Sequence, residues 1–90
     1  MIIAKVVGTV VATRKDESLN GIKLLVVQPL TLDDKPRGTA MLAIDSVGAG
    51  VGEKVLVVFE GKAAGDALGQ KAAAVDAAIV GIVDTVEVRA

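Results

Sequence analysis

The sequence predicts a small all-β domain with one short helix, and three observations support this fold class. Apolar residues recur in short runs rich in valine and isoleucine, as expected for β-strands. Clusters of glycine, proline, asparagine and aspartate separate these runs and indicate turns. The length of 90 residues suits one domain, so residues 1–90 are expected to fold as a single unit.

The first expected strand covers residues 2–13. One face is wholly apolar and consists mostly of small side chains: Ile2, Ala4, Val6, Gly8, Val10 and Ala12. Small side chains on one face suit the inside of a narrow barrel. The opposite face mixes apolar and polar residues, so a neighbour is expected to cover part of it. The charged loop that follows ends in Asn20-Gly21, a strong signal for a backbone reversal.

The second and third strands are expected at residues 22–30 and 39–45. The second is apolar on both faces from Leu24 to Val27, which again implies a covering partner, and Pro29 marks its end or an edge position. The polar segment 33–38 predicts the turn between the two strands.

A glycine-rich stretch, residues 48–52, connects the third strand to a fourth at residues 54–60. A phosphate-binding loop delivers its glycines into a helix N-terminus, whereas these glycines lead into a β-branched strand. Their G-x-G-x-G spacing matches neither the dinucleotide fingerprint nor the P-loop. We therefore interpret the stretch as a structural turn, with a small-ligand site as the alternative.

The last third of the chain contains the expected helix and the fifth strand. Residues 63–74 are rich in alanine, but Gly65 and Gly69 limit the prediction to one or two helical turns. Residues 75–88 are expected to form the fifth strand, with a bend at Gly81. Five short strands and one brief helix predict a small antiparallel β-barrel of the OB-like kind. A β-sandwich is the alternative, but it needs more strands.

The composition predicts self-association. The chain is 52% hydrophobic and has ten glycines, which is more apolar surface than a domain of this size can bury alone. Other copies of the same chain are the simplest partner.

The composition also argues against several function classes. The chain has no His, Cys, Trp or Tyr, and Phe59 is its single aromatic residue, which excludes thiol, imidazole and tyrosyl chemistry. Paired carboxylates remain candidates for acid–base chemistry: Asp33 with Asp34, Asp45 with Glu53, and Asp76 with Asp84. Most of them are expected in turns where water keeps them ionised, so we expect no catalytic residues, no cofactor and no metal site. A net charge of −1 gives no electrostatic footprint for nucleic acid. No apolar run reaches about 18 residues and no signal peptide is evident, which predicts a soluble cytoplasmic protein without a membrane partner.

Five segments together resemble the EutN/CcmL family, the vertex proteins of bacterial microcompartments. They are KVVGTVVAT (5–13), KDESL (15–19), KLLVVQPL (23–30), SVGAGVGE (46–53) and VDAAIVGIVD (75–84), in the family's order and spanning nearly the whole chain. The resemblance implies a five-stranded barrel that forms a cyclic homopentamer and closes the corners of a cytoplasmic protein shell around enzymes. Its implied partners are other copies of the chain and hexameric or trimeric shell proteins.

Within this resemblance we assign candidate contact residues. The expected subunit contacts lie on the outward faces of the first two strands and at the start of the fifth: Val7, Val11, Leu25, Val27, Val75, Asp76, Ala77 and Ala78. The turn expected near the five-fold axis, where it would leave a narrow pore, comprises Gly48, Ala49, Gly50, Val51 and Gly52. The alternative is an OB-fold module that binds single-stranded nucleic acid or serves as an adaptor.

Overall fold

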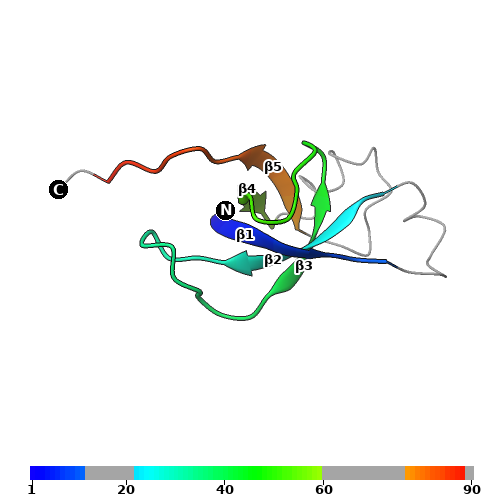
Figure 1. The fold of residues 1–90 in the computed structure, drawn as a ribbon, viewed down its shortest axis with the longest axis horizontal. Helices are drawn as coiled ribbons and strands as arrows, with labels where there is room; N and C mark the ends of the chain where they lie inside the picture. Colours follow the sequence, from blue (N-terminus) through cyan, green and yellow to red (C-terminus); the bar gives the residue numbers. More distant parts are fainter. Residues whose placement is uncertain (12–21, 60–76, 89–90) are drawn as a thin grey trace.

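The computed structural model describes residues 1–11, 22–59 and 77–88, and these fold into a closed barrel of five strands (Figure 1). The strands are β1 (Ile2–Thr9), β2 (Leu24–Pro29), β3 (Met41–Asp45), β4 (Lys54–Val58) and β5 (Ala78–Ile82). Around the barrel the order is β1-β2-β3-β5-β4, and β4 pairs with β1 to close it. The predicted five-stranded β-barrel is confirmed. The helix predicted at residues 63–74 lies outside the described residues.

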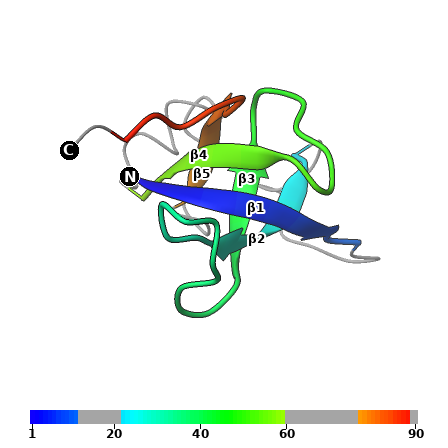
Figure 2. The same cartoon turned by 60° about the vertical axis from the view of Figure 1, so that its left-hand side comes forward.

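One of the five strand pairings is parallel. Ile44 of β3 pairs with Ala78 of β5 in parallel register, whereas the other four pairings are antiparallel. The predicted OB-like barrel is therefore confirmed with one departure, since this pairing is not antiparallel, and the number of strands is the reason. In a closed ring with an odd number of strands, directions cannot alternate all the way round, so at least one neighbouring pair must run the same way. Figure 2 shows β1 and β4 side by side, with β3 crossing behind them.

A β-bulge interrupts the apolar face predicted for the first strand. Val6 pairs with Val27 and Gly8 pairs with Val26, so Val7 is the extra residue on β1. A bulge shifts the alternation by one position. A Cβ at Gly8 would lie 3.7 Å from the Cβ of the outward-facing Val26, so Gly8 does not continue the inward face of Val6. The strand also ends at Thr9, short of the predicted residue 13.

The fifth strand is shorter than predicted because its partner strand runs out. The amide of Val83 donates a hydrogen bond of 2.8 Å to the carbonyl of Lys54, which is the first residue of β4. Because β4 begins at Lys54, it has no further residue to pair with the chain beyond this point, and residues 83–88 continue outside any strand. Figure 1 shows this segment running away from β5 and past the N-terminus. The described residues contain no helix long and apolar enough to cross a membrane.

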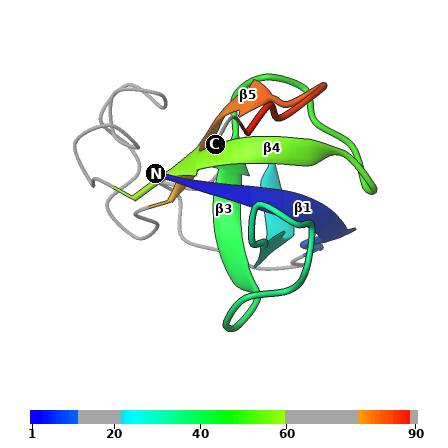
Figure 3. The ribbon, with the colours of Figure 1, turned by 90° about the vertical axis from the view of Figure 1, so that its left-hand side faces the viewer.

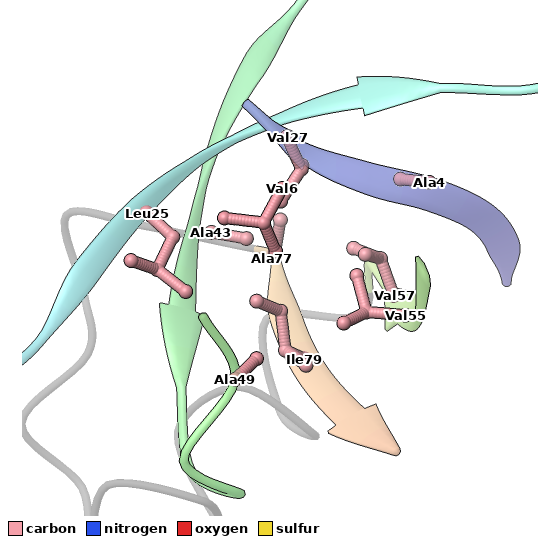
Figure 4. Close-up of a cluster of buried hydrophobic side chains, with 10 residues drawn as sticks. All are labelled: Ala4, Val6, Leu25, Val27, Ala43, Ala49, Val55, Val57, Ala77 and Ile79. Atoms are coloured by element: carbon pink, nitrogen blue, oxygen red, sulfur yellow. The ribbon is translucent and has the colours of Figure 1, made fainter. Parts of the chain in front are cut away.

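The barrel interior is filled mainly by valine and alanine (Figure 4). The side chains of this cluster are Ala4, Val6, Leu25, Val27, Ala43, Ala49, Val55, Val57, Ala77 and Ile79. Ile44 and Ala78 form a second buried cluster, against which Ile22, Leu24 and Val58 pack. Since Ile44 follows the inward-facing Ala43, this second cluster lies on the outside of the barrel wall. Apolar burial is thus divided between the inside and the outside of one sheet.

Candidate subunit contacts and the glycine turn

The carboxylate of Asp45 holds the start of the glycine turn. Asp45 is the last residue of β3, and its Oδ1 accepts hydrogen bonds from the amides of Val47 (3.0 Å), Gly48 (3.1 Å) and Ala49 (3.2 Å). An aspartate that caps its own following backbone in this way favours a turn over continuation of the strand. The side chain of Asp45 is only 2% exposed, so these bonds are largely shielded from water.

Lys23 neutralises the second oxygen of this carboxylate. Its Nζ lies 3.3 Å from Oδ2 of Asp45 and donates a hydrogen bond of 2.9 Å to the carbonyl of Ala49. Burial by itself raises the pKa of Asp45, but the hydrogen bonds from Val47 and Ala49 and the Lys23 ammonium outweigh it and lower the pKa below its ordinary value. Asp45 is therefore ionised at neutral pH and acts as a structural anchor.

A second carboxylate and β1 fix the end of the turn. Glu53 Oε1 accepts the Gly50 amide at 2.7 Å, and the Glu53 amide returns a 3.1 Å bond to the Gly50 carbonyl. Gly52 has a φ of 94°, which glycine adopts without strain, and its amide bonds to the carbonyl of Val6 at 2.8 Å. These bonds support the interpretation of residues 48–52 as a structural turn. Figure 3 shows the segment running around the outside from β3 to β4.

The side chains of the turn point in different directions. Ala49 is fully buried and belongs to the core, whereas Val51 is exposed. Gly48 also has a positive φ, of 80°, and no atom lies within 4 Å of the place where its Cβ would be. The turn therefore presents one exposed apolar side chain, Val51, between Gly50 and Gly52.

The predicted contact residues separate into exposed and buried groups. Val7, at the bulge, is 48% exposed and Val11 is 90% exposed, as outward positions should be. Leu25 and Val27 are fully buried inside the barrel, so the prediction that they face outward is wrong.

The contacts predicted at residues 75–78 have no better support. Ala77 and Ala78 are buried within the subunit and have no side-chain surface to offer a neighbour. Val75 and Asp76 lie outside the described residues.

Several exposed apolar residues were missed by the sequence analysis: Met1, Leu32, Leu42, Val47, Val80, Ile82, Val86 and Val88. Leu32 had a readable signal, because it is a large apolar residue beside the polar turn at residues 33–38. Leu42 and Val80 alternate with inward residues of β3 and β5, so their exposure became evident only once the faces of these strands were known.

The two carboxylates at the glycine turn have structural roles. Asp45 and Glu53, which as a pair could have suggested acid–base chemistry, both accept backbone amides of the turn. Among residues 1–11, 22–59 and 77–88, no three acidic, histidine or cysteine side chains gather in a way that could hold a metal ion.

Comparison with known proteins agrees with the fold and covers nearly the whole chain. The family model described as "Ethanolamine utilisation protein EutN/carboxysome" matches residues 1–84. The bacterial microcompartment shell vertex protein GrpN of Rhodospirillum rubrum is 51% identical over 87 residues, 97% of each chain. The carboxysome shell vertex protein CcmL of Synechocystis is 48% identical over 88 residues, covering 98% of this chain and 87% of the relative.

Solved structures give the same result. The pentameric microcompartment shell protein GrpN from R. rubrum superposes with a TM-score of 0.84 at 49% identity, covering 99% of this chain and 100% of that one. CcmL of Nostoc sp. PCC 7120 superposes with a TM-score of 0.87 at 48% identity, covering 98% and 92%. These relatives are named as structural shell proteins and not as enzymes. The chain therefore belongs to the EutN/CcmL family and is a vertex protein of a bacterial microcompartment shell.

Proposed function

We propose that five copies of the chain close into a ring that caps a vertex of a microcompartment shell in the bacterial cytoplasm, and that the rim of this ring meets hexameric or trimeric shell proteins. The observation that carries the proposal is the near-complete superposition on a shell protein described as pentameric. A ring of identical subunits joins two different surfaces of each subunit, and it closes only at one rotation between neighbours. The proposed function therefore depends on the shape of the subunit and on the rotation between neighbouring subunits.

We assign Val7 and Val11 to the contact between subunits. Both are exposed apolar residues, and the bulge makes Val7 project from β1 out of the regular alternation. Burying two valines against a neighbour contributes about 1.5–3 kcal/mol each. Leu25 and Val27 are left out of this assignment because they belong to the core.

We also assign the turn from Gly48 to Gly52 to the neighbourhood of the five-fold axis. Its support is its low side-chain bulk together with the hydrogen bonds that fix its backbone. Five such turns can approach an axis closely and leave a narrow opening.

The stoichiometry and the Val7–Val11 contact are tested by native mass spectrometry. Five chains of 9.1 kDa give a particle of about 46 kDa. Val7→Asp and Val11→Asp should shift the population toward monomers, because each buries an unpaired charge. Thr39→Asp, at an exposed position in the loop before β3, serves as control and should leave the pentamer intact. A wild-type monomer or dimer, or pentamers unaffected by both valine variants, would contradict the assignment.

The turn is tested by adding bulk at Gly50. Its φ is not in the left-handed region, and a Cβ there would meet only Glu53 Oε1, at 3.5 Å. Gly50→Leu should therefore fold as a subunit while disturbing assembly, whereas Gly50→Ala should fold and assemble normally. Normal pentamers and normal shell closure with Gly50→Leu would contradict the assignment of the turn to the five-fold axis.

No observation favours the single-strand-binding alternative. Proteins of that kind stack bases on aromatic side chains. Phe59, the chain's single aromatic residue, is partly buried against the core.

A further inference from the structure

An apolar groove lies on the outer face of the barrel where β1 and β4 pair. Its volume is about 370 Å³, and it is lined mainly by Met1, Ile2, Ile3, Leu30, Leu32 and Leu56, with Arg37 beside them. Ile3 and Leu56 are paired residues of β1 and β4 and form its floor. Leu32 is 62% exposed at its edge. The groove is thus an apolar surface that the subunit itself leaves open.

The segment that follows β5, residues 83–88, is the complementary feature. It leaves the barrel after the Val83–Lys54 hydrogen bond and extends past the N-terminus (Figure 1). Val86 and Val88 are exposed and stand two residues apart, so in an extended chain they point to the same side. None of the residues 83–88 lines the groove of its own subunit. An exposed segment with apolar side chains on one side is suited to docking on another surface.

We infer that residues 83–88 of one subunit dock into the β1–β4 groove of the next subunit in the ring. Charge supports this pairing: the segment carries Asp84, whereas Arg37 lines the groove. An adjoining pocket, which shares Leu30 with the groove, adds Lys5 and Lys54 against one acidic residue, Asp34.

The reach and the symmetry also fit a second copy of the chain. Six residues of extended backbone span about 17 Å from first to last, enough to leave one barrel and cover the face of an adjoining one. Segment and groove are different surfaces of one subunit, so the contact is head-to-tail and can close a ring. The inference rests on the proposed pentamer, for which it supplies the connecting element.

The absence of native cysteine permits a direct test by crosslinking. Leu32→Cys and Val86→Cys, both at exposed positions, are combined in one chain and treated with a short bis-maleimide reagent, which does not require disulfide geometry. Docking between subunits predicts a denaturing-gel ladder from dimer to pentamer. Each single variant alone, and the matched pair Val47→Cys with Val86→Cys, should remain monomeric. Adding Arg37→Glu to the reactive pair should slow crosslinking by up to about fivefold.

Each outcome decides between the alternatives. A monomer linked internally would mean that the segment folds back on its own groove, and this overturns the inference. Pentamers in native mass spectrometry without a ladder would also overturn it, while leaving the proposed function intact. If the wild-type protein forms no pentamers, both the docking inference and the proposed function are refuted. Circular dichroism of each variant shows that the barrel has folded.

Discussion

Asp45→Asn tests the anchoring of the glycine turn most directly. The amide oxygen can still accept the backbone N–H groups that Oδ1 receives, but the negative charge is lost, and the new amide group faces Lys23 Nζ where Oδ2 lay 3.3 Å away. Hydrogen bonds to a charged group contribute about 1.5–3 kcal/mol, and the three bonds share one oxygen, so they do not add. We expect a loss of about 1–2 kcal/mol, and about 2–3 kcal/mol for Asp45→Ala.

Thermal and urea unfolding followed by circular dichroism measure this loss. For a chain of this size, 1 kcal/mol corresponds to a Tm change of about 4–8 °C, so Asp45→Asn should melt about 5–15 °C lower. Protein concentration is held constant, because assembly adds a concentration-dependent term to the stability. Asp34→Asn is the matched control. Asp34 pairs with Lys54 at 2.6 Å but its side chain is 60% exposed, so its removal should cost less than about 1 kcal/mol.

The pH dependence of stability gives an independent check on Asp45. Its pKa is lower in the folded protein than the ordinary value near 3.9 of an unfolded chain. The stabilisation is therefore fully present above about pH 4 and is lost as pH falls through the folded pKa. Asp45→Asn should remove this part of the acid dependence and Asp34→Asn should not. Equal stability of Asp45→Asn and wild type at pH 7, or identical acid profiles, would refute the anchoring role.

Three further predictions concern the core and the turn. Ile79→Ala empties a fully buried site and should lower the free energy of unfolding by about 2–5 kcal/mol in urea titrations; a loss below 1 kcal/mol would mean that the core collapses to fill the space. Gly52→Ala, at a φ of 94°, should cost about 1–2 kcal/mol by thermal melts, whereas Gly50→Ala should be nearly neutral, and equal costs would contradict the backbone argument. Lys23→Met should raise the pKa of Asp45 in an NMR titration of the carboxyl group, and an unchanged pKa would exclude Lys23 as a cause of its lowering.

The architecture was predictable from the sequence, but the faces of its strands were predictable only in part. Alternating residues in β1 identified Ala4 and Val6 as inward, and both are buried. The run from Leu24 to Val27 is apolar throughout, so it carries no alternation from which a face can be read. Its orientation follows instead from pairing, because Val27 lies opposite the inward Val6. The outward orientation expected for Leu25 and Val27 was wrong for this reason.

The bulge and the segment after β5 could not be read from local sequence. Glycine at position 8 is compatible with either a regular small residue or a bulge, and only the register against β2 decides. Residues 83–88 are rich in valine, as strands are, but whether they form a strand depends on a partner strand, and β4 has no residue before Lys54 to pair with them. The presence of one parallel pairing, in contrast, follows from the odd number of strands in a closed barrel, although its location between β3 and β5 does not.

The structure also explains where the excess apolar content of the chain lies. Of the ten side chains in the barrel interior, four are alanine, so the interior takes up little apolar volume. Other large apolar side chains are exposed outside the barrel, as at Leu32, Leu42 and Val80. Substitutions inside the barrel should therefore change the stability of the subunit, whereas substitutions at these exposed residues should change association. Because the carboxylates of Asp45 and Glu53 fix the glycine turn within each subunit, the turn can meet neighbouring subunits in a set conformation.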